Sequence, residues 1–354
     1  MKIRIDALRA SFENLGVDGV YLTSRTSHRY FTRFDNEDGA LLITKSNAYA
    51  FEDFRYIEVA TNTLSGAFTV IEPKGKRSEW LGDILKREEV SRLGFEDLSM
   101  SVSAYERLKL DVSATLVPVN NTINKMREIK TEDEVLKMEK AQELTDKAFA
   151  HILTMLSPNM TENDVASELE YFMRKNGAED KSFETIAVSG EKSSLPHGVP
   201  GNIKLKKGFL TMDFGATVDG YHSDMTRTVS IGKADEEMKR IYNTVFNAQA
   251  EAMKYIKAGV NCKEADKVAR DVITDAGYGE YFGHSLGHSL GLEIHEMPSC
   301  SPRSEDTLVV GNIVTVEPGI YIPGKYGVRI ENMVLVTENG CENLTNCDNA
   351  LIEL

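Results

Sequence analysis

The sequence has few cysteines, no long apolar run and an excess of acidic residues. Its four cysteines form no CxxC pair, which argues against a disulfide framework and a cysteine-based zinc site, so we expect free thiols in a reducing cytoplasm. No run of about 18 apolar residues is present, so no transmembrane helix is expected. The net charge of −14 disfavours nucleic acids and anionic membranes as partners, because both require clustered Lys and Arg. The charged segment 1–9 is unlike a signal peptide.

The length of 354 residues and the hydrophobic content of 41% favour two domains with packed cores. Residues 1–124 alternate between helical and strand patterns, which is typical of an α/β domain. Helical patterns cover 2–15, ending at Gly16, and 80–85. Strand patterns cover 20–22, 40–43, 48–51, 68–71 and 92–95. We predict that a second domain occupies residues 125–354.

Helical patterns dominate the first part of this second domain. Thr131 and Glu134 form a capping-box pattern that predicts the start of a long helix. Further helices are expected over 162–176, 234–258 and 262–276. Glycines stand where the residue after each of these helices is expected, at Gly177, Gly259 and Gly277. The helix-and-glycine pattern of 164–177 recurs at an offset of 100 in 264–277, which we interpret as an internal duplication with the functional site between the halves.

Two strand patterns, over 210–214 and 221–229, flank Asp219-Gly220, and Asp-Gly is a strong hairpin signal. A loop at 218–219 would place Asp213 directly opposite Asp224, whereas a loop at 219–220 would make them diagonal neighbours. Both registers place the two carboxylates on one face of the sheet, roughly 5–8 Å apart. Carboxylates this close repel each other unless cations or protons intervene. Large apolar neighbours of Asp213 favour a metal site over an exposed hairpin face.

Downstream segments supply further potential ligands. The stretch 284–296 holds three of the seven histidines, including His288, with small residues beside them. Glu317 and Glu331 interrupt patterns of buried strands, and a buried carboxylate requires a partner or a metal. Two Asp, one His and two Glu form an oxygen-rich set that suits divalent ions such as Mn²⁺, Co²⁺ or Zn²⁺. Four carboxylates and a bridging hydroxide balance two such ions better than one.

Taken together, these segments resemble the pita-bread metallopeptidases of the creatinase, aminopeptidase P and prolidase type, specifically the Xaa-Pro-specific branch. The resemblance rests on the motifs in 189–198, 213–215, 223–228, 284–288, 291–296, 316–321 and 327–331. A looser likeness includes Phe54-Arg55-Tyr56. The resemblance implies a creatinase-like α/β domain over 1–124, then an α+β pita-bread catalytic domain over 125–354 with an internal pseudo-twofold duplication. It also implies a cytoplasmic homodimer.

The resemblance also implies a role for each candidate site residue. Asp213 would bind one metal ion, Asp224 and Glu331 would bridge two, and His288 and Glu317 would hold the other. The ions would be two divalent metals per chain, with Mn²⁺ expected first and Co²⁺ or Zn²⁺ as alternatives. The remaining candidate catalytic residues are His197, His284, His295 and Arg329. The resemblance implies that the three histidines line the substrate site. Arg329 lies two residues before Glu331, so strand alternation itself places it on the same face, where it can pair with a ligating carboxylate. Thr226, on the face of Asp224, is expected to contact a ligand in the same way.

The function implied is hydrolysis of the N-terminal Xaa-Pro bond of a peptide with Pro at the second position. A hydroxide bridging the two metals would attack the carbonyl carbon, Glu317 would shuttle the proton, and His295 or His197 would contact the carbonyl oxygen. Two features depart from the family pattern. Asn332 follows Glu331 where Asp is common, and Ser299 stands where many prolidases carry a basic residue for a dipeptide's carboxylate, although Arg303 lies nearby.

Three alternatives differ in substrate or class. One is a prolidase restricted to dipeptides. Another is a pita-bread binding module without peptidase activity, and a third is a metal-independent amidinohydrolase. Relatives of the last two kinds have lost metal ligands, whereas this chain keeps all five.

Overall fold

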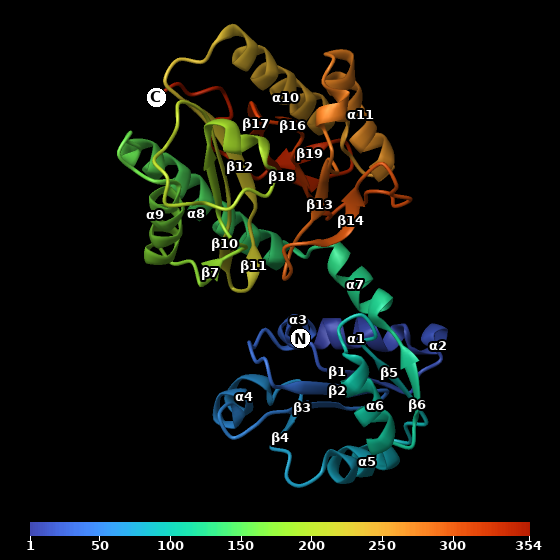
Figure 1. The fold of residues 1–354 in the computed structure, drawn as a ribbon. Coiled ribbons are helices and arrows are strands. Elements are labelled where there is room, and N and C mark those ends of the chain that lie inside the picture. The colour runs from blue at the N-terminus through green and yellow to red at the C-terminus, as the bar shows by residue number, and fades with distance from the viewer. The chain divides into compact units, whose positions relative to one another are not determined.

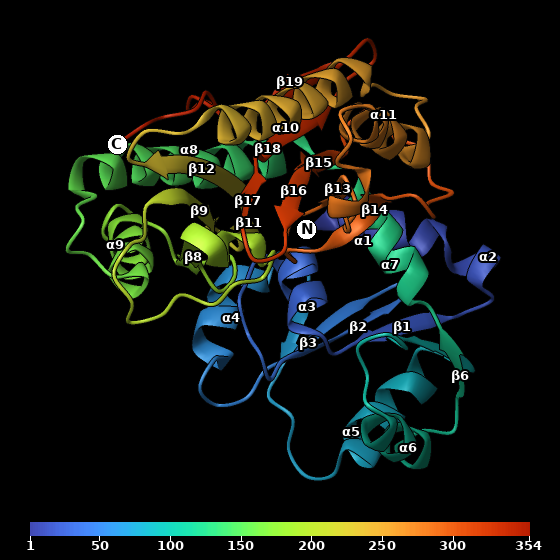
Figure 2. The ribbon, with the colours of Figure 1, turned by 45° about the horizontal axis from the view of Figure 1, so that its top comes forward.

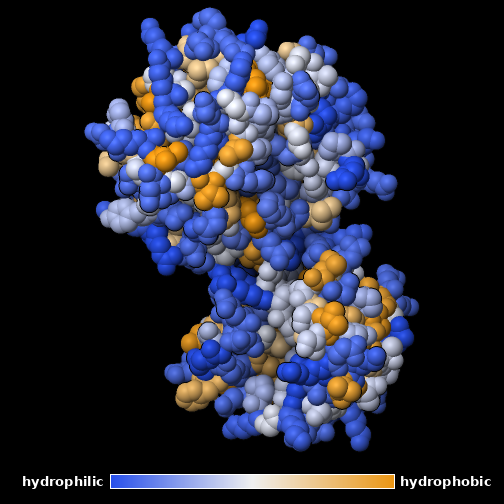
Figure 3. Space-filling model, viewed as in Figure 1, coloured by the Kyte–Doolittle hydropathy of each residue, from blue (hydrophilic) through white to orange (hydrophobic). Residues whose placement is uncertain are grey.

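A computed structural model describes residues 1–354, apart from the side chain of Asn120. The chain divides into two compact units, Met1–Met126 and Arg127–Leu354 (Figure 1). Among the described residues, no helix combines the length and apolar character needed to cross a membrane. On the face drawn in Figure 3, the surface of each unit is mainly hydrophilic and its apolar residues form small patches.

The first unit is an α/β domain around one six-stranded sheet. Its helices are α1 Lys2–Ala10, α2 Phe12–Leu15, α3 Arg25–Thr32, α4 Ile57–Leu64, α5 Arg77–Arg87 and α6 Val102–Asp111. Its strands are β1 Gly19–Leu22, β2 Ala40–Thr44, β3 Ala48–Phe51, β4 Thr69–Ile71, β5 Arg92–Phe95 and β6 Thr115–Pro118. The strand order is β4-β3-β2-β1-β5-β6. Strand β2 is antiparallel to β1 and β3, and the other pairs are parallel.

Helices cover both faces of this sheet, with α1 and α3 on one face and α5 and α6 on the other (Figure 1). Leu81 of α5 and Leu108 of α6 are buried in one apolar cluster with Phe51 of the sheet. The expected single helix over 2–15 is two helices, because the Ser11 hydroxyl donates to Leu8 O (2.6 Å) and competes with the helical pattern there. Gly16 ends the second at φ 63°.

The second unit combines two pairs of long helices with several antiparallel sheets. Helix α7 Asn120–Glu128 leads into α8 Glu132–Met155, α9 Glu162–Lys175, α10 Glu236–Tyr255 and α11 Cys262–Asp275, with short 3₁₀ turns at η1 Gly190–Ser194 and η2 Gly279–Tyr281. The strands of its first half are β7 Asp180–Lys181, β8 Ile186–Ser189, β9 Gly208–Phe214, β10 Ala216–Val218, β11 Tyr221–His222 and β12 Met225–Ile231. Those of its second half are β13 Gly287–Ser289, β14 Glu296–Cys300, β15 Ile313–Val316, β16 Gly319–Ile322, β17 Tyr326–Arg329, β18 Asn332–Val336 and β19 Cys341–Asn343.

The offset-100 repeat is visible in this fold. Helices α9 and α11 each contain 14 residues and start 100 residues apart, and each is followed by a positive-φ glycine, Gly177 or Gly277. Helix α8 packs on α9 as α10 packs on α11. The first pair covers the sheet β12-β9-β8, and the second covers strands of the sheet β14-β13-β15-β18-β19. Figure 2 shows α8, α10 and α11 on the outer side of the strands.

Most predicted helices of this unit are present, with two corrections. Glu134 accepts from Thr131 N (2.9 Å), as the capping-box pattern predicts at the start of α8. Helix α10 is shorter than expected, because Asp235 caps its start and its last residue is Tyr255. The prediction that Gly259 directly follows this helix is therefore wrong. Gly259 lies in the next turn, where its N–H donates to Leu308 O at 2.8 Å.

Candidate metal centre

The hairpin that carries the two aspartates has its loop at 219–220. Asp219 (φ 49°) and Gly220 (φ 79°) both adopt positive φ, as a two-residue type I′ turn requires. The resulting register pairs Thr217 with His222 and, farther along, Asp213 with Thr226. Asp213 and Asp224 are therefore diagonal neighbours, the second of the two predicted arrangements.

The expected strand over 221–229 is interrupted at Ser223 and Asp224, between β11 and β12. The cause is the close approach of the two backbone segments of the hairpin at this point. A Cβ at Gly215 would lie 1.9 Å from Ser223 O, so glycine is required there. The interruption leaves the buried Asp224 outside the regular ladder.

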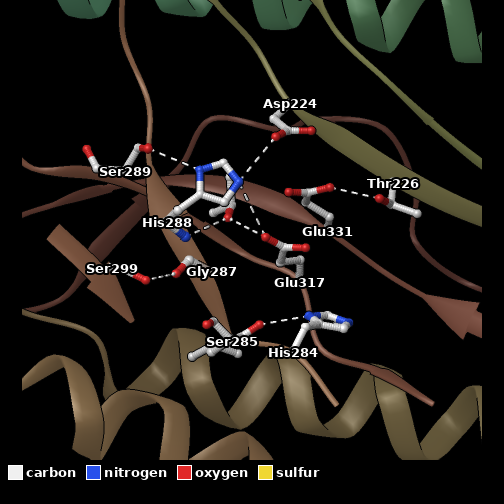
Figure 4. Close-up of polar contacts among 12 residues, drawn as sticks. Asp224, Thr226, His284, Ser285, Gly287, His288, Ser289, Ser299, Glu317 and Glu331 are labelled. Carbon is white, nitrogen blue, oxygen red and sulfur yellow. Dashed lines mark hydrogen bonds and ion pairs between the residues drawn. The ribbon is translucent and has the colours of Figure 1, made fainter. Parts of the chain in front are cut away.

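Side chains from both halves of the second unit meet in this cluster (Figure 4). Ligand atoms of Asp224, His288 and Glu331 all lie within 4.8 Å of one another. His288 Nε2 is 3.5 Å from Asp224 Oδ2 and 3.5 Å from Glu317 Oε1. Glu317 and Glu331 lie at strand junctions, β15–β16 and β17–β18, rather than within strands as expected. At such a junction the direction of the side chain is not set by the alternation of sides along a paired strand.

The cluster brings hydrogen-bond acceptors face to face. Burial, followed by the charge of His295, lowers the pKa of His288 to about 4, so its imidazole is neutral at pH 7. His288 Nδ1 lies 3.0 Å from Ser289 O and must donate its proton to that carbonyl. The lone pair of Nε2 then faces the oxygens of Asp224 and Glu317. Acceptors arranged in this way require a cation or extra protons between them.

The carboxyl pKa values respond to the same crowding. Burial, with the charge of Asp213, raises the pKa of Glu317 to about 8. Burial and neighbouring carboxylates raise the pKa values of Asp224 and Glu331 well above their ordinary range. In the metal-free chain the cluster therefore holds protons that a divalent cation would displace.

Arg329 connects the carboxylates to one another, as the sequence predicted. Its guanidinium donates to Asp213 Oδ2 (2.5 Å) and to Thr226 Oγ1 (2.9 Å), and Thr226 donates to Glu331 Oε2 (2.8 Å). Asp213 Oδ1 is buried and, among the described residues, has no hydrogen-bond partner. A buried carboxylate oxygen without a donor is costly in the absence of a ligand.

The predicted site histidines lie in two different environments. His284 is half-buried, and its Nε2 lies 2.9 Å from Tyr321 Oη, which accepts from Arg329 at 2.6 Å. His295 and His197 are exposed. The His295 ring packs edge-on against His288 at 4.5 Å between centroids, and the charge of His197 contributes to the low pKa of His284. The two exposed imidazoles are thus beside the cluster and accessible to a substrate.

Two departures from the family pattern have definite places. Ser299 lies directly opposite His288 in the β13–β14 ladder, and its hydroxyl donates to Gly287 O at 3.3 Å (Figure 4). Arg303 is exposed in the turn after β14. Asn332 accepts from Arg227 at 3.0 Å, so this departure involves a neighbouring cation rather than the carboxylate cluster.

Sequence reasoning assigned no role to Tyr321 or to the contacts of Glu296. Tyr321 follows Glu317 within a quoted motif, and that position could have suggested it. Glu296 contacts Arg127 and Lys130, which precede it by 169 and 166 residues, and isolated charged residues of this kind look like solvated surface.

The donor set suits a hard or borderline divalent cation, since four carboxylates and a neutral imidazole converge with one oxygen lacking a donor. The family model described as "Metallopeptidase family M24" matches residues 136–338 of this chain. The model described as "Creatinase/Prolidase N-terminal domain" matches residues 4–129.

Individual proteins match along the whole chain. An Xaa-Pro dipeptidase of Pyrococcus furiosus is 37% identical over 99% of this chain and 100% of its own. The solved structure of an Xaa-Pro dipeptidase from Bacillus anthracis has a TM-score of 0.97 at 43% identity, covering 100% of this chain and 99% of the other. That of an X-Pro aminopeptidase from Thermotoga maritima has a TM-score of 0.93 at 36% identity, covering 99% and 100%. The two-domain fold predicted from the sequence is thereby confirmed, and the chain belongs to metallopeptidase family M24, whose members use divalent metal.

Proposed function

We propose that this chain is an Xaa-Pro peptidase that holds two divalent ions through Asp213, Asp224, His288, Glu317 and Glu331. The observation that carries the proposal is the lone pair of His288 Nε2, which faces carboxylate oxygens at 3.5 Å in a buried cluster. The names of relatives similar over nearly the full chain support the substrate class. Mn²⁺ is the ion expected, with Co²⁺ and Zn²⁺ as alternatives.

Bound divalent ions would lower the pKa of water and so supply a nucleophile near neutral pH. The chain's own residues prepare the rest of the site. Arg329 fixes Asp213 and, through Thr226, Glu331, so that the ligands are oriented before substrate arrives. His197 and His295 are accessible donors for the carbonyl oxygen that gains charge during attack. Glu317 is the proposed carrier of the proton to the leaving proline nitrogen.

The metal requirement can be tested directly. We expect dialysis against EDTA to abolish hydrolysis of Ala-Pro and of Ala-Pro-Ala-Ala, and one of Mn²⁺, Co²⁺ or Zn²⁺ to restore it. Metal content measured on the same samples should return to two ions per chain. Full activity of a protein with no detectable metal would contradict the proposal.

Substrate length depends on what holds the far end of the peptide. A guanidinium or ammonium that pairs with a dipeptide's carboxylate makes a strong charge-assisted contact, and the position opposite His288 is Ser299 instead. We therefore expect longer Xaa-Pro peptides to be cleaved and dipeptides to be accepted but not required. Comparison of kcat/KM for Ala-Pro and Ala-Pro-Ala-Ala checks this. Cleavage of dipeptides alone, abolished by Arg303→Ala, would make the chain a strict prolidase.

A pita-bread binding module without activity is the second candidate, and the complete ligand set disfavours it. The functional division into a creatinase-like domain over 1–124 and a catalytic domain over 125–354 is part of the proposal. The homodimer and the cytoplasmic location expected from the resemblance stay predictions.

A further inference from the structure

Behind the proposed site lies a buried ion cluster formed by Arg127, Lys130 and Glu296. The Glu296 side chain is 4% exposed, and those of Arg127 and Lys130 are 7% and 2% exposed. Arg127 donates to Glu296 Oε1 at 2.7 Å, and Lys130 donates to Oε2 at 3.2 Å. Although burial raises the pKa of the Glu296 carboxyl, the two cations more than offset this effect and lower it. Glu296 is therefore a charged anchor.

This anchor lies where the strand pairing is irregular. In the β13–β14 ladder His288 pairs with Ser299, but the next residue, Ser289, pairs with Glu296. The register shift between His288 and Ser289 is a β-bulge, and a bulge re-aims the side chains beside it. His295 directly precedes Glu296, and its ring contacts that of His288.

The contacts of the cluster hold both sides of this bulge. Lys130 donates to Ser289 Oγ at 3.0 Å, and the carbonyl of Ser289 accepts from His288 Nδ1. In the loop that leads into β14, Glu293 N donates to Glu296 Oε1 at 3.1 Å. Gly291 packs directly against the Glu296 carboxylate, because a Cβ there would lie 2.9 Å from Glu296 Oε2 and would force a shift.

We propose that Glu296 is a positioning residue for the proposed peptidase reaction: held by Arg127 and Lys130, it fixes the bulge so that His295 stays against His288. This inference rests on the proposed function. Glu296 contacts no ligand of the proposed metal centre, and it acts through the backbone and through His295. Its loss should lower turnover without removing metal.

The test is Glu296→Gln, which keeps the shape of the side chain and removes its charge. For the metal-loaded variant we expect kcat to fall by about 10- to 10²-fold, the range typical of residues that orient metal-site groups. Metal content and KM should stay close to those of the wild type. Hydrogen exchange of the metal-free variant should increase in residues 288–298 and stay unchanged in 213–224.

Glu293→Gln is the matched control. Glu293 accepts from the same Arg127 (2.6 Å), but its side chain is 50% exposed, whereas that of Glu296 is 4% exposed. We expect its kcat and its exchange pattern to match those of the wild type. Equal effects of the two substitutions would overturn the proposal, because the shared loss of an Arg127 contact would then explain both.

A double variant, Lys130→Met with Glu296→Gln, distinguishes a loss of stability from a loss of the His295 position. It removes one cation together with the anion. If the double variant regains the wild-type Tm but kcat stays low, Glu296 positions the site. If both Tm and kcat return, or if Glu296→Gln alone has wild-type kcat, the proposal is wrong. A wild-type protein that cleaves no peptide with any metal would instead refute the proposed function, while the exchange data would still test the anchor.

Discussion

Carboxylates are buried in both units of the chain, but their partners differ. In the first unit, Glu96 accepts from Thr23 N (2.7 Å), Ser24 N (2.9 Å) and the Ser24 hydroxyl (2.7 Å). Glu52 is equally enclosed, between His28 at 2.8 Å and the Asn36 amide. Each of these carboxylates finds enough donors within the protein to offset its burial.

The four carboxylates of the candidate metal centre, in the second unit, have fewer such donors. Asp224, Glu317 and Glu331 lie near one another and near Asp213, and Arg329 is the cation that contacts this group directly. The pKa values of the first three are raised, mainly by burial. The comparison teaches that a single buried carboxylate with enough donors indicates a structural role, whereas several that face one another with few donors indicate a site for a cation.

The strongest way to break this comparison is to remove a bridging ligand. We expect Asp224→Ala and Glu331→Ala each to lose both metal ions and to reduce turnover by more than about 10²-fold, the upper loss for residues outside a ligand set. Asp213→Ala should leave one ion partly bound. Metal analysis after gel filtration, together with kcat on Ala-Pro-Ala-Ala, checks the three variants.

The matched variant in the first unit is Glu52→Gln. The substitution removes the charge that pairs with the buried His28 and Asn36 side chains. The free energy of unfolding should therefore fall by about 1–3 kcal/mol, while metal content stays at the wild-type value. The comparison would fail if Glu52→Gln released metal, or if all three substitutions in the cluster retained two ions per chain.

A smaller effect is expected for the exposed histidines beside the cluster. His197→Ala and His295→Ala should each keep the metals and lower kcat by roughly 10²-fold, if these imidazoles stabilise the charge that develops on the carbonyl oxygen. Wild-type turnover in either variant, or loss of its metal, would contradict the assignment. His151→Ala provides a control, since His151 pairs with Glu168 at 2.7 Å on the α8–α9 surface.

The last predicted effect is a pH dependence of stability. Burial is the main cause that lowers the pKa of His284 from 6.5 to about 4. As the pH falls, the His284 imidazole therefore takes up a proton in the unfolded chain before it does so in the folded one. The contribution of the neutral His284 to stability is fully present above pH 6.5. It is lost as the pH falls toward 4, by at most roughly 3 kcal/mol. In metal-free protein, His284→Gln should remove this part of the loss. Denaturant unfolding of both proteins at pH 7.5 and 4.5 measures it, and parallel losses would refute the assignment.

Local signals allowed much of this to be predicted from the sequence. The Asp219-Gly220 turn specified a hairpin that brings Asp213 and Asp224 to one face, and the choice between its two registers required backbone φ angles. The pairing of Arg329 with a candidate ligand followed from strand alternation. Both are short-range consequences of turn and strand geometry.

Features that depend on distant contacts were not predictable in the same way. The helices α3, α4 and α6 went unpredicted, because each is short and its apolar face appears only against the sheet. The Arg127–Glu296 pair joins residues 169 positions apart, and nothing near either residue marks it as buried. The interruption at Asp224 likewise results from contact between Gly215 and Ser223 across the hairpin.

The repeated halves of the second unit have a consequence for how the protein could be divided. A cut between 231 and 236 would leave Asp213 and Asp224 on one fragment and His288, Glu317 and Glu331 on the other. Each fragment would keep its own pair of long helices, but neither would carry a complete set of donors. The two ions would then bind groups from two separate fragments, and their affinity would report how well the fragments reassemble.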